Sequence, residues 1–182
     1  ARNGFDPRAV RADVQPLHDL HAFVELHVEQ GRGLVDLGQP VAVGSEILGH
    51  GRWRVVVDGE GNHAGTTLMT DRRDPMVAAA RVVQAVRDVA RSTDDARATV
   101  GRLQPVPGGT NVIASRVDLW IDVRHPDDTV TLALVERIRV EAARLAAEEG
   151  CVSTLTEESF SATTSFDPVL RRRLESVLPD AP

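Results

Sequence analysis

The sequence predicts an α+β fold in which two helices cover one face of a four-stranded sheet. Two patterns support this prediction. Several segments alternate apolar and polar residues, as a strand with one buried face does. Two longer segments repeat apolar residues every three or four positions, as a helix with one buried stripe does. Between residues 52 and 157 these segments follow in the order strand, helix, strand, strand, helix, strand, which is the βαββαβ order of a ferredoxin-like sandwich.

Alternation defines the strands of this unit. Trp53, Val55 and Val57 alternate with polar neighbours, and that strand ends at Asp58 and Gly59. Two more strands are predicted over residues 98–103 and 152–155. The strand over residues 116–124 alternates most strictly. Its expected inner residues are Val117, Leu119, Ile121 and Val123, and its expected outer residues are Arg116, Asp118, Trp120, Asp122 and Arg124.

Capping residues and apolar stripes define the two helices. Asp74 can cap the first helix, with Pro75 at its first position. The stripe of this helix consists of Ala79, Val82, Val83, Val86 and Ala90. The second helix begins within residues 126–129, and Gly150 closes it. Its stripe consists of Leu134, Ile138, Ala142 and Leu145.

Further segments are predicted outside this unit. Residues 6–20 and residues 166–178 are each predicted as a helix, and a brief turn of helix is expected before Gly38. Residues 23–30 are predicted as a strand. One face of that strand would carry Val24, Leu26 and Val28, and the other Glu25, His27 and Glu29. We also expect an internal part of a longer protein, because both ends have a loop-like composition.

The composition argues against several classes of function. The 182 residues are 42% hydrophobic and only 3% aromatic, and the formal net charge is -6. Such a chain does not favour nucleic-acid binding, which relies on basic surfaces and base stacking. No stretch approaches the roughly 20 apolar residues that a membrane helix needs, so no membrane partner is expected. Cys151 is the only cysteine, which excludes an internal disulfide and a Cys-based zinc site and favours a reducing, cytoplasmic setting.

The first candidate for chemistry is an imidazole between two carboxylates. His27 shares its predicted strand face with Glu25 and Glu29. A neighbouring carboxylate can hold a metal-bound histidine in one tautomer, so the pattern suits a metal ligand with hydrogen-bonded support. The alternative, which the spacing alone leaves open, is a polar strand face in contact with solvent.

The second candidate is the segment Asn-His-Ala-Gly-Thr-Thr at residues 62–67, which is dense in small and hydrogen-bonding groups. Gly65 would let the backbone approach a ligand closely, and His63 could donate to an oxyanion as charge develops there. The alternative is a glycine-rich turn with a solvated histidine. Residues 59–64 formally match a dinucleotide-binding glycine pattern, but we reject that match because no helix starts there.

Two further polar residues could bind a ligand. Asn111 could offer its amide to a polar substrate, or it could simply favour a turn. Arg124, at the end of its strand, could clamp a carboxylate with two parallel hydrogen bonds. The alternative for Arg124 is an ordinary ion pair with Asp122 or Asp127. His50 and His125 have no potential catalytic or metal-ligating partner at a spacing typical of a functional motif, and we expect both to be structural or solvated.

Taken together, residues 25–31, 62–69, 111–113 and 122–124 resemble the amidase, hydantoinase and carbamoylase family in order and spacing. This family includes N-carbamoyl-L-amino acid hydrolases, ureidopropionases and allantoate amidohydrolases, within a clan of aminoacylase and carboxypeptidase-type dinuclear metallohydrolases. The resemblance implies a ferredoxin-like dimerisation domain, or lid, over residues 49–160. It also implies that residues 1–48 and 161–182 are parts of an α/β metallohydrolase catalytic domain.

The resemblance further implies a role for each candidate residue. His27 would bind one of two divalent metal ions, which could be Zn, Mn, Co or Ni. Gln30 would help to orient the substrate, and Arg124 would clamp its carboxylate. His63 and Asn111 would reach the reacting centre, in this family commonly that of a neighbouring subunit. The implied partners are a small anionic ureido or amino-acid substrate and a second copy of the chain in a homodimer. The reaction would be C–N hydrolysis of N-carbamoyl-L-amino acids or related ureido acids.

The sequence departs from the family pattern at three places. Leu68 stands where the family usually has Pro, Ala114-Ser115 replaces a usual Pro-Gly, and His50-Gly51 replaces a usual Gln-Arg. These departures leave the loop geometry and the substrate preference open, although none of them removes a group that has an implied role.

The other metal ligands of the family have no counterpart in the sequence. These are an upstream His, a bridging Asp, a Glu beside the general-base Glu, and a downstream His. Because a metal site needs several ligands at once, we expect the chain alone to be inactive. Two alternatives to the ureido hydrolase stay open: a peptidase or aminoacylase of the same clan, and a non-catalytic dimerisation or ligand-binding module.

Overall fold

The computed structural model describes residues 18–178. Most of the helix predicted over residues 6–20 lies outside the described residues. The chain divides into two compact units: Ser45–Ser165 forms one, and residues up to Gly44 together with residues from Phe166 form the other. The mixture of helices and antiparallel strands that the predicted class requires is observed. Within the described residues, no helix combines the length and the apolar composition needed to cross a membrane.

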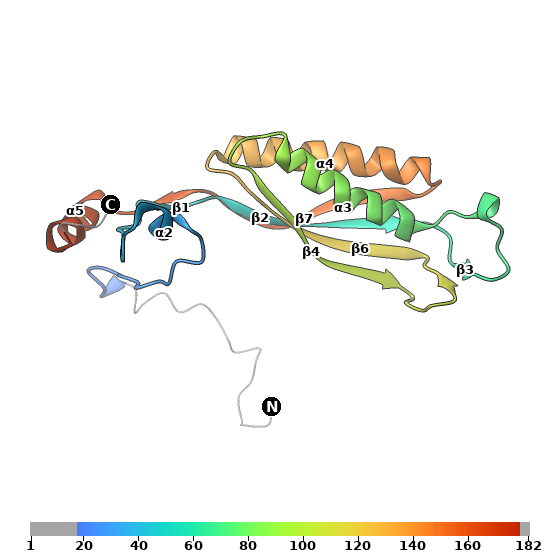
Figure 1. Cartoon of the computed structure of the whole chain (residues 1–182), viewed down its shortest axis with the longest axis horizontal. Helices are drawn as coiled ribbons and strands as arrows, with labels where there is room; N and C mark the ends of the chain where they lie inside the picture. Colours follow the sequence, from blue (N-terminus) through green and yellow to red (C-terminus); the bar gives the residue numbers. More distant parts are fainter. Residues whose placement is uncertain (1–17, 179–182) are drawn as a thin grey trace, which may run out of the picture. The chain divides into compact units, whose positions relative to one another are not determined.

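A four-stranded antiparallel sheet forms the centre of the Ser45–Ser165 unit (Figure 1). Its strands are β2 (His50–Asp58), β4 (Arg97–Val106), β6 (Arg116–Arg124) and β7 (Val152–Ser161), in the spatial order β4-β6-β2-β7. The bounds of β6 are those predicted, whereas β4 and β7 extend beyond the predicted residues 98–103 and 152–155. Two-residue strands form two small additional pairs, β1 (Glu46–Ile47) with β8 (Thr164–Ser165) and β3 (Asn62–His63) with β5 (Val112–Ile113).

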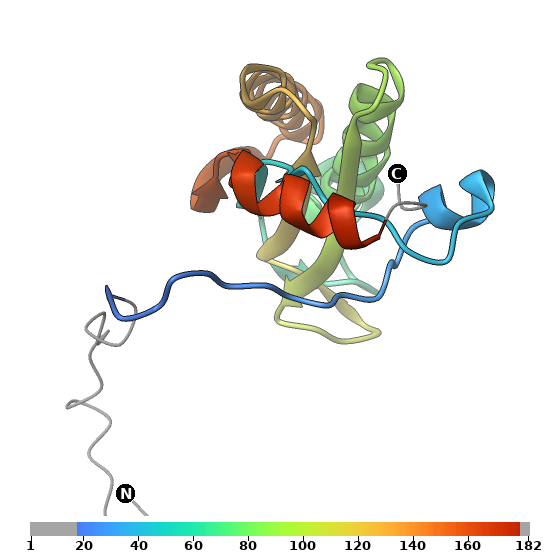
Figure 2. The ribbon, with the colours of Figure 1, turned by 90° about the vertical axis from the view of Figure 1, so that its left-hand side faces the viewer.

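Two long helices, α3 (Pro75–Arg91) and α4 (Asp128–Glu148), cover one face of this sheet (Figures 1 and 2). The Asp74 carboxylate caps α3 by accepting from the Met76 amide at 2.9 Å, as predicted. Asp127 caps α4 in the same way, accepting from the Thr129 amide at 2.7 Å. Each cap satisfies a backbone donor that has no partner within its helix.

The core lies between the helices and the inner face of the sheet. The four predicted inner residues of β6 are fully or almost fully buried, and so are Trp53, Val55 and Val57 of β2. From the helices, most of the predicted stripe residues are buried: Ala79, Val82, Val86, Ala90, Leu134, Ile138, Ala142 and Leu145. Aliphatic side chains fill most of this space, and the ring of Trp53 lies 6.2 Å from that of Phe160 between ring centres. The apolar periodicities therefore predicted the core.

The opposite face of the sheet is polar but not fully open to water. Asp118 lies on the outer face, as predicted, yet only 2% of its surface is exposed. Its Oδ1 atom accepts from Arg54 at 2.8 Å, and its Oδ2 atom lies 3.3 Å from Arg116 Nη2. The guanidinium groups of Arg54 and Arg102 lie 5.4 Å and 4.3 Å from the centre of the Trp120 ring. Long cationic side chains thus cover this face while their charged ends stay near water.

Within residues 18–178, the other unit includes the short helices α2 (Gly33–Leu37) and α5 (Pro168–Val177). Both were predicted, and the Asp167 carboxylate caps α5. The strand predicted over residues 23–30 is wrong: these residues form no regular element and are exposed. Alternation alone does not make a strand, because an extended segment needs a neighbouring strand edge for its hydrogen bonds, and no described residue pairs with this segment.

The core assignment predicts that replacing two different leucines by alanine has very different effects on the free energy of unfolding. Leu119→Ala, at a fully buried position of β6, should lower the free energy of unfolding by about 2–5 kcal/mol because it leaves a cavity. Leu132→Ala, on the outer side of α4 and 46% exposed, should change it by no more than about 0.5 kcal/mol. Urea unfolding of the two variants measures both values, and equal losses would contradict the assigned core.

Candidate functional site

The first part of the candidate site is the loop that carries His63. Strand β3 pairs with β5, so that Asn62 lies opposite Ile113 and His63 opposite Val112. The next amide, that of Ala64, donates to the carbonyl oxygen of Asn111 at 2.9 Å. These pairings bring together two residues that the sequence patterns singled out, His63 and Asn111. Figure 1 shows β3 beyond the end of the four-stranded sheet.

Local hydrogen bonds fix the backbone of this loop. The carbonyl oxygen of His63 accepts from the Thr67 amide at 3.2 Å and from the Thr67 hydroxyl at 2.9 Å. The amide of His63 donates to the side-chain oxygen of Asn62 at 2.9 Å. Small and hydrogen-bonding residues are needed here because they close the loop on itself. The alternative of a turn is therefore correct for the backbone, and it leaves the role of the imidazole open.

A shallow hollow of about 410 Å³ lies beside this loop. Its lining residues are Gly61, Asn62, His63, Pro107, Val112 and Ile113. The side chains of His63 and Asn111 are exposed. Within the described residues, the side-chain amide of Asn111 forms no hydrogen bond. An imidazole at the rim of a largely apolar hollow can donate to a small polar ligand, and Asn111 directly precedes Val112, which also lines the hollow.

The second part of the candidate site is Arg124, at the other end of β6. Its Nε atom donates to Asp122 Oδ1 at 2.6 Å and its Nη2 atom to Asp122 Oδ2 at 3.0 Å. The ion pair that the sequence left as an alternative is therefore present. Hydrogen bonds from Arg124 hold the pKa of the Asp122 carboxyl below its usual range, and the same bonds raise the pKa of Arg124. The pair displays a guanidinium in the two-pronged geometry that binds carboxylates.

The two parts of the site lie far apart within one chain. The His63 loop adjoins the start of β6, because only two residues separate the end of β5 from Arg116, whereas Arg124 is the last residue of the strand. Eight steps along a strand span about 26 Å at the usual rise per residue. The structure thus brings His63 and Asn111 together, and it does not bring Arg124 to them.

His27 and Gln30 belong to the other unit, and both are exposed. The Nδ1 atom of His27 lies 2.6 Å from the carbonyl oxygen of Val28. Glu29, expected beside His27, instead accepts from the amides of Gly33 and Leu34, at 2.6 and 3.1 Å, and so caps the start of α2. Among residues 18–178, no group of three or more His, Cys, Asp or Glu side chains could hold a metal ion. The described residues thus offer one candidate ligand, which does not make a metal centre.

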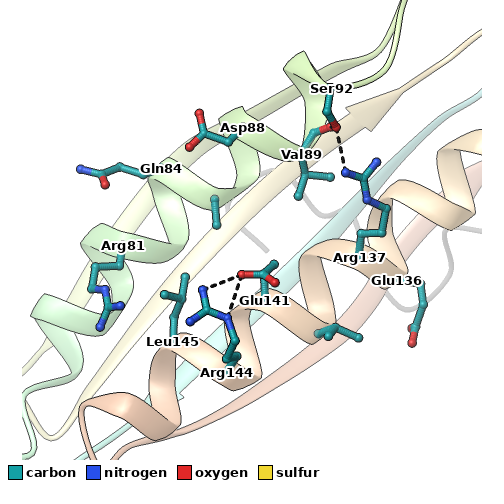
Figure 3. Close-up of a pocket in the computed structure, with 12 residues that line it drawn as sticks. Arg81, Gln84, Asp88, Val89, Ser92, Glu136, Arg137, Glu141, Arg144 and Leu145 are labelled. Atoms are coloured by element: carbon teal, nitrogen blue, oxygen red, sulfur yellow. Dashed lines mark hydrogen bonds and ion pairs between the residues drawn. The ribbon is translucent and has the colours of Figure 1, made fainter.

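A second hollow, of about 640 Å³, lies between α3 and α4 and contains none of the predicted site residues (Figure 3). Only part of its charge is paired within it: Arg144 donates to Glu141 at 2.8 Å, whereas Arg81 donates at 3.1 Å to Glu149, which is not a lining residue. Arg137 donates to the Ser92 hydroxyl at 2.8 Å. Because both arginines and carboxylates line this hollow, it has no single charge that would select a ligand.

His50 and His125 have local contacts. His50 Nδ1 lies 3.2 Å from the carbonyl oxygen of Leu48, and His125 Nδ1 accepts from the Asp127 amide at 2.9 Å. Sequence patterns do not single out Arg72, yet its guanidinium donates to the carbonyl oxygens of Ala64 and Thr67. The available signal was its position, a few residues after a loop whose carbonyls need donors.

Several known proteins that are similar to the chain are named amidohydrolases. No family model matches it. The N-carbamoyl-L-amino-acid amidohydrolase of Paenarthrobacter aurescens is 37% identical over 155 residues, which cover 85% of the chain and 38% of that protein. The allantoate amidohydrolase of Escherichia coli (strain K12) is 42% identical over 120 residues, which cover 65% of the chain and 29% of that protein. A crystal structure of a hydantoinase/carbamoylase family amidase from Burkholderia vietnamiensis matches with a TM-score of 0.80 and 32% identity, over 85% of the chain and 38% of that structure. The chain thus spans well under half the length of these relatives.

The ion pair at the end of β6 predicts a specific titration. In Arg124→Gln the pKa of Asp122 should rise toward its ordinary value, because the hydrogen bonds that lower it are lost. Carbon-13 NMR of the Asp122 carboxyl measures this change. Arg139→Gln, which removes the partner of Glu136 only, should leave Asp122 unchanged.

The sign of the pH effect follows from the direction of that shift. Because the pKa of Asp122 is lower in the folded chain, the pair stabilises the fold above the unfolded pKa of aspartate, and this contribution is lost as the pH falls through the folded value. An Asp122 pKa that stays low in Arg124→Gln would show that another group lowers it.

Proposed function

Because the chain belongs to the amidase, hydantoinase and carbamoylase family, we propose that the intact protein is a metal-dependent amidohydrolase of N-carbamoyl-L-amino acids or related ureido acids. The observation that carries this proposal is the sequence identity of 37% to an N-carbamoyl-L-amino-acid amidohydrolase, in an alignment that covers 85% of the chain. In this proposal, residues 49–160 serve as a ferredoxin-like lid and dimerisation domain, and residues 1–48 and 161–182 belong to a catalytic domain. The order and pairing of the four main strands support the assignment of the lid.

The distance between Arg124 and His63 supports a site shared by two copies. A small ureido acid is far shorter than the roughly 26 Å that eight steps of β6 span. One molecule of substrate therefore cannot contact Arg124 and His63 of the same chain. In a homodimer with a two-fold axis, the Arg124 end of one copy can meet the His63 loop of the other, and the symmetry forms two such sites.

Each residue has a distinct task in this site. Arg124 binds the substrate carboxylate through the guanidinium N–H groups that its bonds to Asp122, from Nε and Nη2, leave over. Asn111 and Gln30 orient the ureido group through their amides. His63 donates a hydrogen bond to the oxygen that becomes negatively charged in the tetrahedral transition state, where a positioned donor has its largest effect.

The metal requirement is also part of the proposal. His27 would supply one ligand to a pair of divalent ions such as Zn, Mn, Co or Ni, which would polarise the ureido carbonyl when bound. The described residues lack a group of three donors, so the other ligands would belong to the rest of the intact protein. We therefore propose that the 182-residue chain alone neither holds two ions nor turns over substrate. Turnover by this chain with added metal would contradict that statement.

Mixing two inactive variants of the intact protein tests the shared site. His63→Ala and Arg124→Ala should each lower kcat/KM for an N-carbamoyl-L-amino acid by about 100-fold or more, because each removes a positioned charge or donor. When equal amounts are mixed and allowed to exchange subunits, half of the dimers are mixed and each mixed dimer has one intact site. About a quarter of the wild-type activity should therefore return.

Two results would contradict this prediction. If mixing restores no activity although mass spectrometry detects mixed dimers, His63 and Arg124 act within one copy. If the intact protein hydrolyses N-acetyl amino acids but no N-carbamoyl amino acid, the substrate class is wrong and an aminoacylase is the correct assignment. Arg139→Ala, which removes an exposed arginine of α4, serves as the control and should keep full activity.

A further inference from the structure

We propose that Arg72 is a positioning residue that acts through the Gly65 amide to hold His63 in the tautomer with its proton on Nε2. The inference rests on the proposed function, because His63 is the group expected to donate to the transition state. It assigns a task to a residue that does not itself contact the substrate.

Arg72 holds the His63 loop through backbone carbonyls. Its Nη2 atom donates to the carbonyl oxygen of Ala64 at 2.8 Å, and its Nε and Nη2 atoms both donate to that of Thr67 at 3.2 Å. The side chain is half-buried, and no described carboxylate forms an ion pair with it. The guanidinium therefore directs its donors at two carbonyls on either side of Gly65.

The bond from Arg72 to Ala64 controls the orientation of the Gly65 amide. The Ala64 carbonyl and the Gly65 N–H belong to the same peptide unit, which is planar, and in the usual trans form they point in opposite directions. Fixing the oxygen on the guanidinium therefore also fixes the direction of the N–H. A positive charge at the oxygen polarises the peptide unit and makes its N–H a stronger donor.

That N–H donates to the imidazole of His63. The distance from the Gly65 nitrogen to His63 Nδ1 is 3.1 Å. A ring nitrogen that accepts a hydrogen bond carries no proton, so in the neutral ring the proton is on Nε2. The Nε2–H group is then the donor that the exposed ring can offer to a ligand. Arg72, the peptide unit and the imidazole thus form one chain of hydrogen bonds.

Gly65 permits this close approach because it has no side chain. A Cβ atom at this position would lie 3.1 Å from His63 Cε1 and 3.4 Å from His63 Nδ1. The imidazole would then have to shift by a few tenths of an ångström. Gly65→Ala consequently disturbs the ring while it leaves Arg72 in place, which makes it an independent test of the same chain of bonds.

NMR of the nitrogen-15-labelled 182-residue chain tests the proposal without any enzyme assay. At a pH where His63 is neutral, its two ring nitrogens should give the Nε2–H pattern in long-range proton–nitrogen spectra. In Arg72→Ala the pattern should move toward the tautomer mixture of free histidine, and Gly65→Ala should move it in the same direction. Arg72→Lys should restore part of the wild-type pattern, because an ammonium group can donate to one of the two carbonyls. Arg73→Ala, the neighbouring arginine, is the control and should change nothing.

Kinetics of the intact protein give the second readout. Arg72→Ala should lower kcat by about 10- to 100-fold with a smaller change in KM, as expected when a catalytic group is misplaced rather than removed. In a His63→Ala background, the same substitution should have little further effect, because both act through one ring.

Failure of this inference is distinguishable from failure of the proposed function. Unchanged His63 nitrogen shifts in both Arg72→Ala and Gly65→Ala would overturn the positioning role, whatever the intact protein hydrolyses. If Arg72→Ala does not fold, the nitrogen shifts of Gly65→Ala and Arg72→Lys decide the question in its place. An intact protein without activity toward ureido acids would reject the proposed function, while the NMR result would still decide whether Arg72 sets the tautomer.

Discussion

Continuous hydrogen bonding along β6 is the constraint on which the placement of the candidate groups depends. All nine residues of this strand pair with β2, from Arg116 opposite Asp58 to Arg124 opposite His50, and β4 pairs with its other edge. A strand that is paired on both edges cannot bend or shorten without losing ladder hydrogen bonds. The sheet therefore fixes the distance between the two ends of β6, and with it the distance between the loops at those ends.

Packing on both faces makes this sheet rigid. On the inner face, the helices and the apolar side chains of β2 and β6 exclude water. On the outer face, Asp118 is buried beneath Arg54 and Arg116, and the Trp120 nitrogen donates to Glu158 at 3.1 Å. A carboxylate held in this way ties neighbouring strands together and resists replacement, because its removal leaves two cations without a partner. The result is a rigid support with polar groups at its ends, which is where binding residues commonly lie.

Local patterns predicted much of this architecture and little of the site. The strict alternation from Arg116 to Arg124 predicted β6 with its correct bounds, and Asp74 marked the start of α3, because both signals depend only on nearby residues. The contact between the His63 loop and Asn111 depends on two strands of two residues each, which are too short to show a period. The same limit explains two contacts that the sequence did not predict. The burial of Asp118 comes from an arginine on another strand, and Glu29 caps a helix instead of supporting His27.

A shared site requires that a single ligand is bound by the Arg124 end of one copy and the His63 loop of another. A crystal structure of the intact protein with a bound N-carbamoyl amino acid would decide whether this is so. We predict that the carboxylate of the ligand contacts Arg124 of one copy and that its ureido group contacts His63 and Asn111 of a second copy. A ligand held by Arg124, His63 and Asn111 of the same copy would contradict the shared site.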